Sequence, residues 1–325
     1  MADHAEDDFD GDIFIYRGGR APLHITHALI NESVLEIEDN AFNHCPRLVQ
    51  VDTHDGIRRI GRFAFSNCDS LPRINLKSVV EIDDYAFHRC RGMESVEFGD
   101  MLETIGKYAF NGCDSLRHLK LPSIITIGTS AFNHCNRLTD VELSRRLETI
   151  GADAFYYCSR LQRIAVPMKR DLFSFDVDDG VFQRLSQFDA CEQLTTVDLV
   201  GGIHKTVASL HMESWRTEMI TEINSINQVL SITAFGKTDE IQQWMDVIID
   251  KMDHYKVEHS RYVKEGISLL ELALWKAKLG EKEDSSVEGQ TKKAKIDSES
   301  VRKERRVTCG ADTVIKNVLP FLELE

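Results

Sequence analysis

The sequence has no run that approaches about 18 consecutive apolar residues, so no segment is expected to span a membrane. It is also poor in positive charge, because 39 lysines and arginines stand against 53 aspartates and glutamates and give a formal net charge of −14. Phosphate affinity depends on many uncompensated basic side chains, so this balance argues against nucleic-acid binding. The acidic start of the chain lacks the basic and apolar parts of a secretion signal, which predicts a cytoplasmic protein with reduced thiols.

Closely spaced cysteine pairs are absent too, since none of the eight cysteines forms a Cys-x-x-Cys motif. Instead, six cysteines close six copies of the phrase Ala-Phe-x-x-Cys, and successive copies are 22 or 23 residues apart. The six are Cys45, Cys68, Cys90, Cys113, Cys135 and Cys158. Because each occupies the same phase, we expect small buried hydrophobic side chains, with no metal, no disulfide and no cofactor.

A period this short and strict predicts stacked supersecondary units, a solenoid with a continuous core. Each copy continues as Leu-x-x-Val-x-Leu, for example from Leu116 to Leu121, and the alternation predicts a strand with one face in the core. A connecting stretch then closes on isoleucine, usually followed by glycine, as at Ile105 and Gly106. We expect these glycines to occupy turns of positive φ.

The combined phrase Ile-Gly-x-x-Ala-Phe-x-x-Cys-x-x-Leu-x-x-Ile-x-Leu-Pro, seen best from Ile105 to Pro122, resembles the BspA-type leucine-rich repeat. The flanks, including Tyr16–Gly19 and Leu194–Thr206, resemble those of a subset of diatom proteins of that type. The resemblance implies a leucine-rich repeat fold with a strand-lined concave face and usually a protein-binding role. The expected fold is therefore α+β: a β-solenoid of about seven coils, an N-terminal β-hairpin cap and a C-terminal helical hairpin.

Changes in pattern along the chain predict six segments. A disordered acidic tail (1–12) precedes a cap (13–34), in which two β runs flank Gly18-Gly19, and the solenoid (35–204). Apolar residues at helical spacing then predict a helical hairpin (205–279), and a charged stretch predicts a disordered linker (280–306). The last segment (307–325) regains apolar residues, so we expect it to pack on the helices.

Two short motifs offer other functions. The loop Gly201–Thr206 lies between a strand and a helix and ends in Lys-Thr, as a phosphate-binding loop does, but His204 stands where that loop needs glycine. A nucleotide-binding switch or enzyme built on this loop is the alternative to a binding protein. The basic cluster Lys292–Arg306 resembles a nuclear import signal, although nearby acidic residues also suit a solvated linker.

The predicted binding site is the solvent-facing side of the strands. The alternation places two columns of side chains there, and their mixed, moderately acidic character suits a protein or peptide with basic spots. A polar exterior that serves only solubility stays an alternative. We predict a non-enzymatic interaction scaffold. The residues predicted to contact the partner are Arg73, Asn75, Ser95, Glu97, His118, Lys120, Asp140, Glu142 and Arg163.

Overall fold

The computed structural model describes residues 9–10, 13–173, 186–201, 207, 208, 210, 212–230 and 236–284. It divides into two units, Met1–Asp253 and His254–Glu325. The first unit holds the repeats, and the described part of the second is the continuation of one helix. Among the described residues, no helix combines the length and apolarity needed to cross a bilayer.

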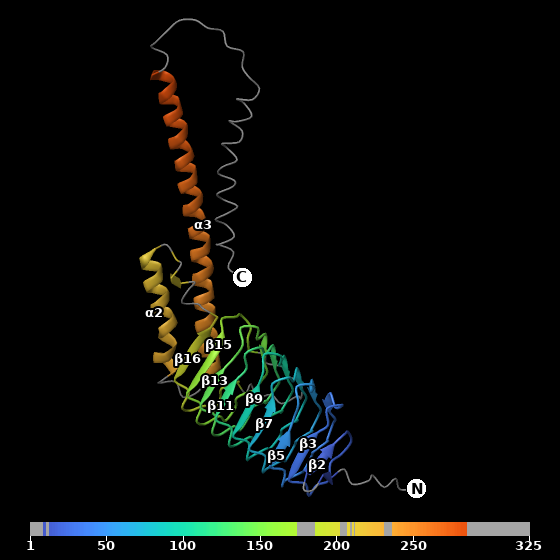
Figure 1. Ribbon diagram of the computed structural model, residues 1–325. Coiled ribbons are helices and arrows are strands. Elements are labelled where there is room, and N and C mark those ends of the chain that lie inside the picture. Colours follow the sequence, from blue (N-terminus) through green and yellow to red (C-terminus); the bar gives the residue numbers. More distant parts are fainter. Residues whose placement is uncertain are drawn as a thin grey trace, which may run out of the picture. The chain divides into compact units, whose positions relative to one another are not determined.

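The repeats form a β-solenoid of stacked coils, in which every coil contributes a long strand and the six middle coils also contribute a short one (Figure 1). The long strands lie side by side in chain order and pair in parallel wherever they share a ladder. They are β2 (Ile13–Tyr16), β3 (His27–Ile30), β5 (Gln50–Asp52), β7 (Arg73–Leu76), β9 (Ser95–Phe98), β11 (His118–Lys120), β13 (Asp140–Glu142), β15 (Arg163–Pro167) and β16 (Thr196–Val200). We call their solvent-facing side the long-strand face.

The short strands form one parallel sheet in the order β14-β12-β10-β8-β6-β4. They are β4 (Glu36–Ile37), β6 (Arg59–Ile60), β8 (Glu81–Ile82), β10 (Thr104–Ile105), β12 (Thr126–Ile127) and β14 (Thr149–Ile150). Their isoleucines point into the core, so the short sheet closes each coil opposite the long strands.

Phenylalanines stack through the core at one residue per coil. Ring centroids of successive phenylalanines from Phe42 to Phe155 are 4.9–5.4 Å apart and their planes are within 8° of parallel. The ladder continues to Phe188, 5.8 Å from Phe155, which marks a seventh coil whose alanine is replaced by Gln187. One coil cannot bury this much apolar surface alone, and stacking supplies the missing contacts.

The cysteines confirm the expected burial. From Cys68 onward, each thiol of the repeat donates a hydrogen bond to the phenylalanine carbonyl of the preceding coil, with Sγ–O distances of 3.0–3.4 Å. Burial raises the pKa of the six repeat thiols from Cys45 to Cys158, for instance to about 12 at Cys90, so these six stay protonated at neutral pH. All seven cysteines of the described residues are buried and free.

The glycines after the closing isoleucines serve close packing, and the expectation of positive φ is wrong for them. Positive φ falls instead on Gly18, Gly19, Gly112, Gly201 and Gly236 and on non-glycine residues of the coils, such as Tyr108 at 57°. A Cβ added at Gly106 would lie 2.5 Å from the backbone nitrogen of Asp84, and at Gly151 it would lie 2.4 Å from that of Thr129. These positions therefore require glycine because the preceding coil's backbone lies against them.

The N-terminal cap differs from the predicted hairpin, because β2 and β3 pair in parallel. Ten residues connect them, from Arg17 to Thr26, which lets the chain cross over and start β3 in the same direction as β2. The antiparallel pair is instead formed by β2 with β1 (Phe9–Asp10), and β1 lies in the tail expected to be disordered. Tyr16 extends the aromatic ladder, 5.0 Å from Phe42, so this segment is a shortened first coil.

Two helices close the other end of the solenoid. Helix α2 (Glu213–Leu230) supplies Asn227, whose Oδ1 accepts a hydrogen bond of 2.9 Å from the backbone of Val197 in the last strand. Helix α3 (Lys237–Asp284) begins with a buried lysine, Lys237, whose Nζ donates to the carbonyl of Leu194 at 2.6 Å. These contacts satisfy backbone groups that an open sheet edge would leave exposed.

The two helices also bind each other within the first unit. Trp244 Nε1 donates to the carbonyl of Glu222 at 2.9 Å, and Lys251 pairs with Glu218 and Glu222. The expected helical pair is therefore present, and α3 continues to Asp284. In the second unit, this helix exposes large apolar side chains, among them Leu269 and Trp275.

Candidate protein-binding surface

The two predicted columns lie on the long-strand face where the strand registers place them. His118, Asp140 and Arg163 are direct cross-strand neighbours in one column, and Lys120 and Glu142 are neighbours in the other. Arg73 pairs with Ser95 and Asn75 with Glu97 on β7 and β9. All nine predicted residues are exposed or half-buried, whereas the residues between them point inward. The second column is interrupted at Ala165, which is only 2% exposed, and resumes at its cross-strand neighbour Asp198.

Most carboxylates of these columns have a cationic partner on a neighbouring strand or turn. Arg163 bridges two of them, with Nη1 3.1 Å from Asp140 and Nε 2.6 Å from Asp198. These carboxylates raise the pKa of Arg163 against the opposing effect of its burial. The other pairs are Lys120–Glu142 at 3.5 Å and Lys77–Glu97 at 2.8 Å. The negative charge that predicted a basic partner is thus largely neutralised within the surface itself.

A pocket of about 500 Å³ opens beside His118 at the start of β11, β13 and β15. Its lining residues are Arg117, His118, Arg137, Thr139 and Arg160. Arg137 and Arg160 hold the same repeat position, two residues after the cysteine in successive coils, and Arg117 directly precedes β11. All three arginines are exposed. We call Arg117, Arg137 and Arg160 the arginine triad.

Hydrogen bonds fix the backbone and the smaller side chains of this pocket. The backbone nitrogen and Oγ1 of Thr139 both donate to the carbonyl of Arg117, at 2.8 and 3.1 Å. Thr139 Oγ1 also lies 3.4 Å from Nδ1 of His118. The carboxylate of Asp114, on the coil of Arg117, accepts a 2.9 Å hydrogen bond from the amide of Asn136. Within the described ranges, no side chain pairs with any guanidinium of the triad.

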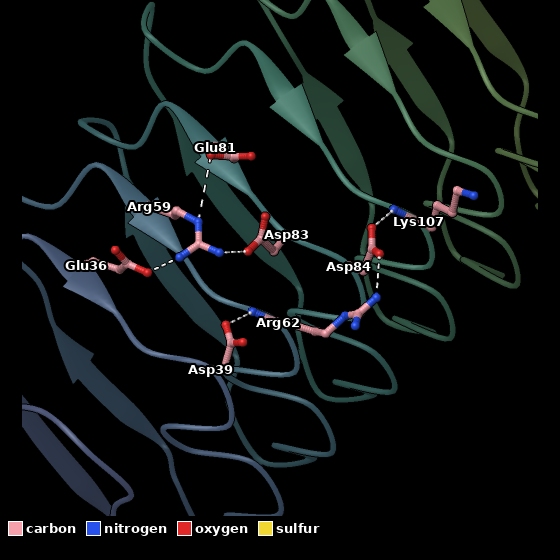
Figure 2. Close-up of polar contacts among 8 residues, drawn as sticks. All are labelled: Glu36, Asp39, Arg59, Arg62, Glu81, Asp83, Asp84 and Lys107. Carbon is pink, nitrogen blue, oxygen red and sulfur yellow. Dashed lines mark hydrogen bonds and ion pairs between the residues drawn. The ribbon is translucent and has the colours of Figure 1, made fainter.

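A second pocket, of about 290 Å³, lies along the short strands and shows the opposite arrangement. Figure 2 shows Arg59 surrounded by the carboxylates of Glu36, Glu81 and Asp83, each of which it pairs with. Arg62 pairs with Asp84 at 3.0 Å. We call these residues, together with Asp39, the short-strand network.

Aspartates of the short-strand network also hold the coils together. Asp39 Oδ1 accepts a 2.8 Å hydrogen bond from the backbone nitrogen of Arg62, and Asp84 Oδ1 accepts one of 2.7 Å from Lys107 (Figure 2). Each aspartate therefore satisfies a backbone donor one coil further on. This network is a structural feature whose cations are already occupied.

Sequence reasoning identified the columns and missed the triad, because it considered only positions inside the strands. The triad lies at the strand entrances, where reading the repeat in phase aligns Arg137 with Arg160. Arg47 holds the same position in an earlier coil and has no arginine one period later. The sequence signal for the triad was thus a pair of arginines separated by one repeat.

Several sequence predictions fall outside the described residues. Of the loop Gly201–Thr206, the structure describes Gly201, with φ of 114°. The basic cluster Lys292–Arg306 and the segment 307–325 also lie outside the described ranges. Nucleotide binding, nuclear import and cytoplasmic residence accordingly stay predictions. No group of three or more His, Cys, Asp or Glu residues in the described part of the chain is placed to hold a metal ion.

Comparison with known proteins identifies the repeats. A family model described as a BspA type leucine-rich repeat region, in six copies, matches residues 22–123 and 80–182. No curated protein matches the chain.

Among solved structures, a leucine-rich repeat protein from Bacteroides ovatus is 24% identical, with 54% of this chain and 61% of that chain covered and a TM-score of 0.37. A leucine-rich repeat protein from T. pallidum is 22% identical, with 62% and 88% covered and a TM-score of 0.39. The chain therefore spans less than two thirds of the Bacteroides ovatus protein's length.

Proposed function

Since the chain belongs, through its repeats, to the BspA-type leucine-rich repeat family, we propose that it is a non-enzymatic scaffold that binds a segment of a partner protein on its long-strand face. Repeat proteins of this kind commonly serve as protein-interaction scaffolds and are typically not enzymes. The observation that carries the proposal is the pair of solvent-facing columns, ordered in register over a fully packed aromatic ladder.

Rigidity supports this role. The strands that carry the columns are fixed by parallel pairing and by the stacked phenylalanines beneath them, so their side chains lose little backbone freedom on binding. The strands from β3 to β16 span about 34 Å at the usual strand spacing, and each presents about 13 Å of its length. An extended peptide of about ten residues matches those dimensions better than a flat domain surface does.

Affinity purification tests the proposal. We compare the wild-type protein with a variant in which His118, Lys120, Asp140 and Glu142 are replaced by alanine. A matched variant replaces Glu103, Arg146 and Glu148, which lie by the short strands; both variants remove one lysine or arginine charge and two carboxylates. Proteins captured from lysate of the source cells are quantified by mass spectrometry.

We expect a partner that the wild type and the matched variant retain and that the long-strand variant loses. We expect both variants to melt at the wild-type temperature, because the replaced side chains are exposed or half-buried. Unchanged melting is the control that both variants fold. Equal retention by all three proteins would move the binding site away from the long-strand face and contradict the proposal.

A further inference from the structure

The arginine triad is an unneutralised cluster of cations in an acidic protein. The chain carries 53 carboxylate side chains against 39 lysines and arginines, so carboxylate partners are plentiful. Nevertheless, none of the described residues pairs with Arg117, Arg137 or Arg160, although Arg163 on the neighbouring strand contacts two carboxylates. The triad is therefore not explained by the ion pairs that stabilise the rest of this surface.

The positions of the triad residues concentrate positive charge. Arg137 and Arg160 occupy one position in adjacent coils, whose strands are about 4.8 Å apart, and Arg117 lines the same pocket. Like charges at this separation repel each other. A bound anion offsets this repulsion because it attracts each of the guanidinium groups. Uncompensated arginines around a pocket are a common arrangement for recognising anions.

The donors around the pocket fit a phosphate group better than a carboxylate. One guanidinium satisfies both oxygens of a carboxylate with two parallel hydrogen bonds, so a carboxylate needs only one arginine. A phosphate monoester presents three acceptor oxygens and close to two negative charges, which matches several guanidinium groups. The pocket volume of about 500 Å³ lies within the usual range for small-ligand sites.

We infer that the arginine triad binds the phosphate of a phosphorylated serine or threonine in the partner segment that crosses the long-strand face. This inference rests on the proposed function and specifies the partner's chemistry. His118 belongs both to the pocket and to a surface column, so a peptide lying along the column passes the pocket entrance. The pocket opens onto a column of strand side chains that an extended peptide can follow, which favours a phosphopeptide over a free nucleotide.

Fluorescence anisotropy with peptide libraries tests the inference. Three labelled libraries share degenerate flanking positions and differ at one fixed central position, which holds phosphoserine or phosphothreonine, glutamate, or unmodified serine or threonine. The site variant is Arg137→Gln with Arg160→Gln. The control variant is Arg20→Gln with Arg47→Gln, which removes the same charge from exposed arginines outside the pocket, one of them at the equivalent repeat position.

We expect the phosphorylated library to bind wild type and control alike, and the site variant to bind it about tenfold or more weakly. The glutamate and unmodified libraries should bind at least about tenfold more weakly than the phosphorylated one. Binding should also weaken with rising salt, and less steeply in the site variant. Equal binding of the phosphorylated library by wild type and site variant would overturn the inference.

Other outcomes separate this inference from the proposed function. Equal binding of the glutamate and phosphorylated libraries would show that the pocket binds acidic peptides in general and does not select phosphate. Inorganic phosphate that binds as tightly as the phosphorylated library would show a small-anion site with no peptide contribution. If no library binds while the purification still yields a partner lost by the long-strand variant, the phosphate inference fails and the scaffold proposal stands.

Discussion

The two arginine-lined pockets of the solenoid differ in how their charges are satisfied. On the short strands, Glu36, Arg59 and Glu81 are direct cross-strand neighbours, so each carboxylate meets the guanidinium one coil away. Beside the long-strand face, Arg137 and Arg160 repeat the same charge from coil to coil. Both pockets are built on the same stack of coils, and they differ in whether the charge alternates or repeats from one coil to the next.

This difference shows how a repeat protein separates structure from binding. Opposite charges one period apart neutralise each other and join neighbouring coils. Like charges one period apart stay unneutralised until a ligand of opposite charge binds. The interior ladder supports both pockets without distinguishing them. Changes in the core should therefore affect both pockets equally, and changes in surface charge should separate them.

The largest expected effect comes from Phe110→Ala, in the coil that carries Arg117. Phe110 is fully buried between Phe87 and Phe132, so its loss leaves a cavity and should reduce the free energy of unfolding by about 3–5 kcal/mol. Urea denaturation measures the change, with Tyr157→Ala as the control because that aromatic is 46% exposed. A loss below about 1 kcal/mol for Phe110→Ala would contradict a continuous core.

Arg59→Gln should be the next in size. It removes the cation that three carboxylates share and leaves Glu36, Glu81 and Asp83 to repel one another, so stability should fall by about 1 kcal/mol, since the site is partly exposed. The loss should shrink at high salt. Arg20→Gln, an exposed arginine outside the network, should change little. Equal losses for the two variants would show that the network contributes nothing.

Asp153 lies on one of the last coils of the solenoid and, unlike the residues of the arginine triad, is acidic. Burial, with a smaller contribution from Asp189, raises its pKa from 3.8 to about 6. Because the folded-state pKa of Asp153 is raised, the contribution of this group to stability is greatest below about pH 4 and is lost as pH rises through about 6.

The variant Asp153→Asn removes this titration. It should therefore be more stable than wild type at neutral pH by about 1 kcal/mol, after allowance for solvent screening of a half-buried group. The gain should vanish at low pH, and asparagine tolerates the positive φ of 56° at this position. Thermal melting across the pH range measures it, and a gain that does not depend on pH would rule out the titration.

The smallest effect on stability should come from Arg137→Gln with Arg160→Gln. Removing like charges that lack partners should raise stability by about 0.3 kcal/mol in chloride, the opposite sign to Arg59→Gln. Replacing chloride by phosphate at equal ionic strength should stabilise the wild type more than this variant. A loss of stability in chloride would show that the two arginines serve the fold.

Much of this architecture was predictable because six copies of the repeat keep the same spacing of apolar residues. The Phe and Cys ladders follow from the fixed spacing of Ala-Phe-x-x-Cys, and the surface columns follow from strand alternation. Phe188 could have been found as well, since Phe188-x-x-Cys191 keeps the spacing after the alanine is lost.

Other features depend on three-dimensional proximity that spacing does not encode. The parallel pairing of β2 with β3 depends on the crossover path, which a Gly-Gly pair does not reveal. The role of Gly106 depends on the backbone of the preceding coil. The neutralisation of Asp140 depends on the reach of Arg163 across strands, which a count of formal charges does not reveal.

The most direct test of the central claim uses a photoreactive benzoylphenylalanine at one position at a time. Placed at His118, it lies on the long-strand face beside the triad; placed at Glu148, it lies by the short strands. After irradiation in lysate of the source cells, adducts are identified by mass spectrometry. We predict one specific protein adduct from position 118 and none from position 148. The same adduct from position 148, or none from 118, would contradict it.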